Sequence, residues 1–117
     1  MGLASACDIC VASTKAQFGT TEVRLGILPS AIGPYVVRAI GERQAYRYFQ
    51  TAERIGAERA REIGLVHEVA EPEALDAKLQ DVIDALLAAA EQAMELARED
   101  GGNDVRYDVR DDLPINE

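Results

Sequence analysis

Residues 17–34 read QFGTTEVRLGILPSAIGP and contain a single acid, Glu22, in a mostly apolar setting. Three glycines and two prolines interrupt this segment, so its backbone must bend instead of running straight through a core. Ser30 and the pair Gly33-Pro34 are typical of a helix start, with Pro34 at the first helical position. The pattern therefore predicts a carboxylate a few residues before a helix N-terminus, where backbone N–H groups are free to bind an oxygen.

This arrangement of Glu22 has two interpretations. A carboxylate next to aimed N–H donors can transfer a proton beside a polarised carbonyl group. Alternatively, an acid in the first turn of a helix is common, because the helix dipole favours negative charge there. From the residues alone, Glu22 is either a candidate acid/base or a first-turn surface acid.

Residues 18–29 follow the pattern Phe-Gly-x-x-Glu-Val-x-Leu-Gly-x-x-Pro, accompanied by ACDICVA at residues 6–12 and GLVHEV at residues 64–69. Through these motifs the chain resembles the enoyl-CoA hydratase/isomerase (crotonase) family, and within it methylglutaconyl-CoA hydratase-like members most of all. The resemblance covers roughly residues 2–80 and is poor after about residue 88. It implies an α/β fold, the C-terminal part of a crotonase-like domain in which short buried strands are followed by helices.

The resemblance also implies a reaction. Such a protein is a lyase that adds water to the double bond of a 2-enoyl-CoA, in fatty acid metabolism or amino-acid catabolism. Glu22 aligns with the family's general acid/base glutamate, and the backbone N–H of Ser30 falls near the position of the catalytic water. The CoA thioester is itself the substrate, so neither a metal nor another cofactor is implied. Isomerisation of the double bond needs the same groups without added water, so Glu22 does not separate hydratase from isomerase.

Gly2 falls where many hydratases of this family carry a first catalytic glutamate, which leaves Glu22 as the only candidate acid. Residues 1–6 are apolar and begin without a helix cap. In the family, the N–H donors for the thioester oxygen come from a glycine-rich turn just before this point and from further upstream. We therefore expect a truncated form with little hydratase activity alone. The alternative is a non-catalytic crotonase fragment that acts as an oligomerisation or interaction module.

The composition fits one soluble globular domain, since the chain has 117 residues, of which 48% are hydrophobic and 28% charged. The net charge of −9 argues against a nucleic-acid partner. No apolar run approaches the roughly 20 residues of a membrane helix, and no secretory signal pattern opens the sequence. The expected partners are an acyl-CoA substrate and further copies of the chain, and the expected location is cytoplasmic.

Cys7 and Cys10 form a C-x-x-C pair, which in other settings is a redox pair or half of a zinc site. A second cysteine pair is missing from the sequence, and His67 is the single histidine. Two small, buried and reduced thiols on a short strand are therefore the favoured interpretation. His67 suggests a general base. No carboxylate or nucleophile lies at motif spacing from it, so we expect a structural role.

The first part of the chain is predicted to consist of short elements. Thr20 or Thr21 is expected to cap a turn or short helix, and Arg24 to be a solvated or ion-pairing charge. Gly41 and Gly64 are expected to end helices. The expected elements are strands at residues 8–12 and 17–19, a short strand or extended loop at 65–69, helices at 33–40, 42–51 and 57–63, and a turn at 55–56.

Residues 72–99 are predicted to form one long helix that Pro72 opens. Its apolar residues fall on one stripe at helical spacing: Leu75, Leu79, Val82, Ile83, Leu86, Ala90, Ala93 and Ala97. A small body cannot bury so long a stripe, so we expect it to pack against another subunit or a missing segment. The family resemblance implies that such a C-terminal helix contacts other subunits in a trimer or hexamer. The expected organisation is a partial crotonase-like catalytic core at residues 1–71, an oligomerisation-type helix at 72–99 and a mobile acidic tail at 100–117.

Overall fold

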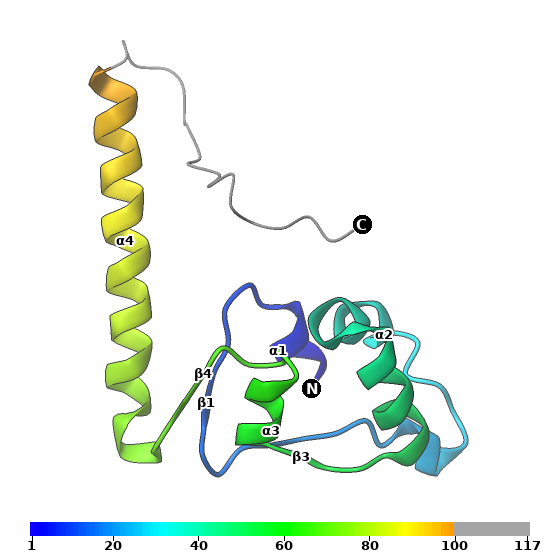
Figure 1. Ribbon diagram of the computed structural model, residues 1–117. Coiled ribbons are helices and arrows are strands. Elements are labelled where there is room, and N and C mark those ends of the chain that lie inside the picture. Colours follow the sequence, from blue (N-terminus) through cyan, green and yellow to red (C-terminus); the bar gives the residue numbers. More distant parts are fainter. Residues whose placement is uncertain (100–117) are drawn as a thin grey trace. The chain divides into compact units, whose positions relative to one another are not determined.

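The structure is a computed structural model, and it describes residues 1–99. Its elements in chain order (Figure 1) are α1 (Gly2–Ala6), β1 (Val11–Ser13), β2 (Gln17–Phe18), the 3-10 helix η1 (Glu22–Leu25), α2 (Gly33–Thr51), β3 (Ile55–Gly56), α3 (Ala57–Glu62), β4 (Glu68–Ala70), the 3-10 helix η2 (Pro72–Ala74) and α4 (Leu75–Glu99). The chain divides after Leu79 into two units. The candidate site lies in the first.

Two small sheets join segments that are far apart in the sequence. β1 pairs with β4 in parallel, and β2 pairs with β3 antiparallel. Parallel neighbours need a long crossover, and here the connection between β1 and β4 contains α2 and α3. Strands and helices therefore share one unit, which confirms the α/β prediction.

Three predictions about the strands differ from the structure. The strand or extended loop expected at residues 65–69 is a strand only from Glu68, as β4. β1 begins at Val11 and not at Asp8, because its partner β4 offers only three residues for pairing. The predicted turn at residues 55–56 is wrong, since Ile55 and Gly56 form strand β3 opposite β2. Ile55 is only 1% exposed, so burial of its side chain draws this short segment into the sheet.

One face of α2 provides the centre of the hydrophobic core. Val36 is fully buried, and Tyr48 from the second half of the helix is 3% exposed. Burying a large apolar side chain contributes about 1.5–3 kcal/mol, so these contacts hold the first unit together. The buried cluster consists of Ala12, Val36, Ile40, Ala45, Tyr48, Ile55, Ala60, Leu65 and Val66.

The backbone of α2 is not helical throughout. Gly41 has φ 77° and ψ 158°, a conformation that only glycine adopts readily, and the helix resumes after it. The predicted break at Gly41 is therefore confirmed. Gly64, also predicted to end a helix, has φ 83° and lies just beyond the C-terminus of α3.

Gly41→Ala is expected to destabilise the protein by about 1–3 kcal/mol, the cost of forcing a side chain into that backbone conformation. A Cβ at this position would meet no atom within 4 Å, so backbone strain and not a steric clash would be the cause. Urea unfolding measures the change. Gly56→Ala is the matched control, because its φ is −71° and a Cβ there also meets open space. Equal stability of the two variants would contradict the prediction.

The long helix predicted after Pro72 is confirmed as α4, which follows the 3-10 turn η2. None of its described residues is buried. Its large exposed apolar side chains are Leu79, Ile83, Leu86, Leu87, Met94 and Leu96. A role in oligomerisation stays a prediction. None of the helices within residues 1–99 has both the length and the apolar character needed to span a membrane. The tail predicted at residues 100–117 lies outside the described residues.

Candidate active site

Glu22 is the first residue of η1, and its backbone is fixed by a tight turn. Its carbonyl oxygen accepts a hydrogen bond from the N–H of Ile27 at 3.1 Å, and Gly26 closes the turn with φ 71°. The Glu22 side chain is half-buried. Within residues 1–99, no hydrogen bond or ion pair engages its carboxylate. Both carboxylate oxygens are therefore available to a bound molecule.

Two side chains next to Glu22 hold η1 against the C-terminal half of α2. The hydroxyl of Thr20, a residue that is 1% exposed, donates to the carbonyl oxygen of Tyr48 at 2.9 Å. The guanidinium group of Arg24 donates to the carbonyl oxygen of Ala52 at 3.2 Å. These bonds position the turn that carries Glu22.

This arrangement bears on two expectations. Thr21 is the N-cap residue of η1, one of the two predicted positions, but its side chain makes no capping hydrogen bond, and Thr20 turns inward to a partner 28 residues away. Arg24 is exposed, as expected of a solvated charge, and it also bonds to a backbone carbonyl without an ion pair among the described residues. The sequence could not indicate either partner, since both acceptors are backbone atoms brought near only by the fold.

Thr20→Val is expected to cost about 0.5–1.5 kcal/mol, because valine keeps the shape of threonine but lacks the hydroxyl donor. The Tyr48 carbonyl keeps its other hydrogen bond, from the N–H of Ala52, so its oxygen is not left unsatisfied. Thermal unfolding measures the loss. Thr21→Val is the matched control, because the exposed Thr21 makes no capping hydrogen bond. The prediction is wrong if both valine variants unfold at the same temperature.

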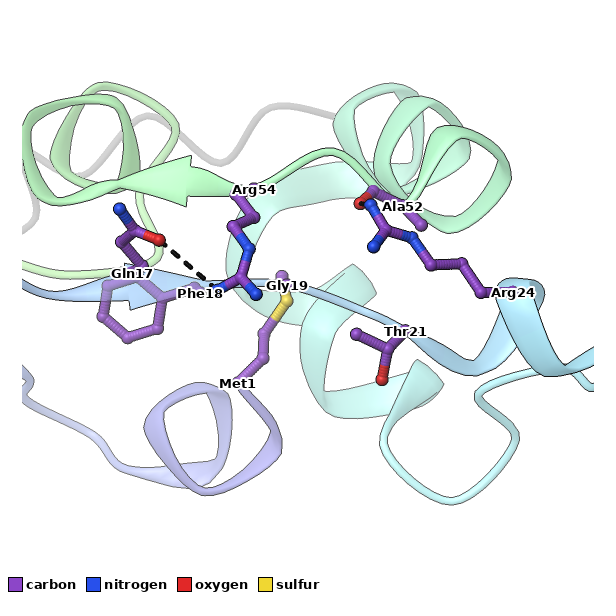
Figure 2. Close-up of a pocket in the computed structure, with 8 residues that line it drawn as sticks. All are labelled: Met1, Gln17, Phe18, Gly19, Thr21, Arg24, Ala52 and Arg54. Carbon is purple, nitrogen blue, oxygen red and sulfur yellow. Dashed lines mark hydrogen bonds between the residues drawn. The ribbon is translucent and has the colours of Figure 1, made fainter.

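An open hollow of about 210 Å³ lies beside this turn. Figure 2 shows Met1 and Thr21 on its rim, with Arg54 reaching across it toward the amide of Gln17. The Arg54 guanidinium donates to Gln17 Oε1 at 3.4 Å. The lining residues are Met1, Gln17, Phe18, Gly19, Thr21, Arg24, Ala52 and Arg54. The hollow thus combines apolar side chains with two guanidinium groups, and no motif in the sequence indicated that these residues line a common hollow.

Ser30 lies on the connection between η1 and α2 and does not cap the helix. The N-cap of α2 is Ile32, and Gly33 precedes Pro34 as the first helical residue. The N–H of Ser30 donates to the carbonyl oxygen of Leu28 at 2.8 Å. A ligand that used this N–H would have to replace that bond, so the role of Ser30 stays a prediction.

His67 ties β4 to β1. The imidazole Nδ1 of His67 accepts a hydrogen bond from the backbone N–H of Cys10 at 3.1 Å. The backbone N–H of His67 donates to the carbonyl oxygen of Cys10 at 2.8 Å. The structural role predicted for His67 is therefore confirmed. This bond requires the Nδ1 of His67 to be unprotonated.

The expectation of two buried thiols is wrong for Cys7, which is exposed because residues 7–9 precede the strand; Cys10 is half-buried. Burial, with a smaller contribution from Cys7, raises the pKa of the Cys10 thiol. Both cysteines are free. Residues 1–99 contain no group of three or more histidine, cysteine or acidic side chains arranged to hold a metal ion.

A family model described as enoyl-CoA hydratase/isomerase matches residues 1–112. The short-chain-enoyl-CoA hydratase of Clostridioides difficile is 38% identical over 98 residues, which are 83% of this chain and 63% of that protein. The trans-2-decenoyl-[acyl-carrier-protein] isomerase of Streptococcus mutans is 40% identical over 85 residues, covering 72% of this chain and 32% of that protein.

A solved structure shows the same fold. An enoyl-CoA hydratase from Shewanella pealeana superimposes with a TM-score of 0.71 at 41% identity, covering 88% of this chain and 40% of that one. The chain thus spans between about a third and two thirds of the length of these relatives. With the motifs around Glu22 and the α/β architecture, these matches show that the chain belongs to the enoyl-CoA hydratase/isomerase family and has a crotonase-like fold.

Proposed function

We propose that Glu22 is the general acid/base of an enoyl-CoA hydratase that adds water to the double bond of a 2-enoyl-CoA, with methylglutaconyl-CoA as the proposed acyl thioester. The observation that carries this proposal is the Glu22 carboxylate, which has no internal partner among residues 1–99 and sits on a turn anchored by Thr20 and Arg24. A carboxylate left free on a fixed backbone is suited to proton transfer. The hydratase names of several relatives support the same reaction.

In the proposed reaction, backbone N–H donors polarise the thioester carbonyl, so that negative charge develops on its oxygen as water adds. Glu22 accepts a proton from the attacking water, whose oxygen bonds to the β carbon. Glu22 then delivers a proton to the α carbon, and the product is a 3-hydroxyacyl-CoA. The carboxylate ends in its starting state, and every atom of the water is in the product. The proposal uses no metal and no cofactor besides the CoA that the substrate carries.

A second candidate function is isomerisation, which the isomerase among the relatives favours. Here Glu22 would remove a proton from one carbon and return it to another, so that the double bond moves and no water is added. A third candidate is non-catalytic. In that case the exposed apolar residues of α4 would make the chain an oligomerisation or interaction module.

We further propose that the protein works in the cytoplasm as a homo-oligomer, a trimer or hexamer, and that these 117 residues alone turn over slowly. The support for low activity is that the chain spans 63% or less of the relatives named above. The backbone N–H groups that bind the thioester oxygen would then have to come from a segment outside these 117 residues.

Two measurements test these candidates. Crotonyl-CoA at 100 times its Kd should stabilise the chain by about 2.7 kcal/mol if an acyl-CoA site is present, whereas free CoA should stabilise it less. Mass spectrometry of the product then separates the reactions, since hydration adds the mass of one water and isomerisation adds none. The absence of any stabilisation by acyl-CoA would refute the enzymatic proposals and favour the interaction module.

A further inference from the structure

The hollow beside η1 is lined by two positively charged side chains. Arg24 and Arg54 belong to the lining, and none of the eight described residues that form it is an acid. Glu22 lies between Thr21 and Arg24 in the sequence, but it is not part of the lining. The chain as a whole has a net charge of −9, so its composition alone does not predict a cationic hollow.

No acid within residues 1–99 neutralises either guanidinium group, since neither Arg24 nor Arg54 forms an ion pair there. Glu53, the acid next to Arg54 in the chain, binds Arg47 at 2.8 Å instead. Each of the two groups uses one N–H in a hydrogen bond, one to a backbone carbonyl and the other to a side-chain amide. A guanidinium group has several more donors, in a fork that matches the oxygens of an oxyanion. Both arginines therefore have donors left for a bound anion.

The fold holds both arginines at the same place. Strands β2 and β3 pair antiparallel, and continuing their register places Gly19 opposite Arg54. Gly19 has no side chain to fill the space there, and a Cβ at this position would have one neighbour within 4 Å, a backbone carbonyl at 3.8 Å. Arg24 is held by the carbonyl oxygen of Ala52, two residues before Arg54. The hollow is thus bordered by hydrogen-bonded backbone on the sides that carry the two charges.

Apolar groups complete the lining of the hollow. Figure 2 shows the side chains of Met1 and Phe18 beside Arg54, and the hydroxyl of Thr21 adds a further polar group. The volume of about 210 Å³ is more than a single oxyanion group fills. A ligand that matches this lining has an anionic end for the arginines and a short hydrocarbon part for the apolar side chains.

We propose that this hollow binds a small phosphate monoester that carries a short alkyl group. The two guanidinium groups bind the phosphate oxygens, and the apolar side chains contact the alkyl group. A phosphate monoester has a charge between about −1.5 and −2 near pH 7, which two arginines match better than they match one carboxylate. Charges farther away than about 8 Å are largely screened at physiological salt, so the local arginines outweigh the negative net charge. The inference goes beyond the proposed hydratase reaction, which assigns no ligand to this hollow.

The ligand class is tested by titration calorimetry with three probes at one ionic strength: butyl phosphate, inorganic phosphate and butyrate. Butyl phosphate is expected to bind about 10-fold more tightly than inorganic phosphate, the gain from burying about two methylene groups. Butyrate has the same hydrocarbon part with a smaller charge, and it should bind more weakly than butyl phosphate. Butyrate binding as tight as that of butyl phosphate, or no binding of either phosphate probe, overturns the inference.

The place of binding is tested with arginine variants. Arg54→Gln is expected to weaken binding of butyl phosphate by about 10-fold or more, the usual effect of losing one charge-assisted hydrogen bond. Arg43→Gln is the matched control, because Arg43 is also exposed and the change removes the same charge from a residue outside the lining. Arg24→Lys keeps the positive charge near η1 but loses the fork, so it should weaken binding less than Arg54→Gln does. If Arg54→Gln binds butyl phosphate as tightly as Arg43→Gln does, the hollow is not the binding site and the inference is wrong.

Discussion

Replacing Glu22 with glutamine is expected to slow hydration of crotonyl-CoA by roughly 10²–10⁴-fold, the range found when a general acid/base is removed. Glutamine keeps the size and the hydrogen-bonding capacity of glutamate, but it cannot accept or deliver the proton. Glu22 has no partner among residues 1–99, so the substitution breaks no internal hydrogen bond or ion pair there. Stability should therefore change by less than about 0.5 kcal/mol while the rate falls.

The rate is best measured under single-turnover conditions with the protein in excess, because the chain alone is expected to turn over slowly. The same substitution should also be made in a chimera, in which residues 1–99 replace the matching segment of a full-length hydratase relative. Glu42→Gln is the matched control, since Glu42 is an exposed acid that directly follows the break at Gly41 in α2. If Glu22→Gln leaves the hydration rate unchanged both in this chain and in the chimera, Glu22 is not the acid/base.

Leu65→Ala is expected to have the largest effect on stability, a loss of about 2–5 kcal/mol. Leu65 is 2% exposed, and its removal leaves a cavity that the surrounding core cannot fully close. Its N–H donates to the carbonyl oxygen of Ala60 at 2.8 Å, which fixes the backbone on one side of that cavity. Since small domains have only about 5–15 kcal/mol of total stability, this single change should unfold a large fraction of molecules near physiological temperature.

Urea unfolding measures this loss of stability. The unfolding midpoint should fall while the m-value, the dependence of the unfolding free energy on urea concentration, stays unchanged. Leu87→Ala is the matched control, because Leu87 is 57% exposed and the same truncation there should change stability by less than about 0.5 kcal/mol. Leu65→Met should retain most of the stability, since the two side chains have similar volume. A cost for Leu65→Ala no larger than for Leu87→Ala would show that Leu65 is not part of the core.

The sequence predicted the features that local residue chemistry determines. Gly41 interrupts α2 because its backbone conformation suits glycine alone, and Pro72 precedes α4 because proline fits a helix start. The family motif around Glu22 predicted the fold, which the comparisons confirm. The catalytic role of Glu22 remains a prediction that its free carboxylate supports.

The sequence did not predict features that depend on distant partners. β3 exists because Ile55 is buried opposite β2, and nothing in its own two residues distinguishes a strand from a turn. Local sequence rules make Thr20 a candidate helix cap, but its hydroxyl donates to the backbone carbonyl oxygen of Tyr48 instead. Ser30 fails as a cap because the chain forms another turn between Leu28 and Gly33 before α2 begins.

The parallel pair of β1 and β4 has a consequence for how the chain folds during synthesis. Cys10 and His67, which are bonded to each other beside this pair, are 57 residues apart. Closing a loop of that length costs roughly 3–4 kcal/mol of chain entropy. On the ribosome, residues 11–13 emerge well before residues 68–70 exist, and until then their backbone groups have no strand to pair with. The synthesis of β4 therefore sets the earliest moment at which the first unit can complete its fold.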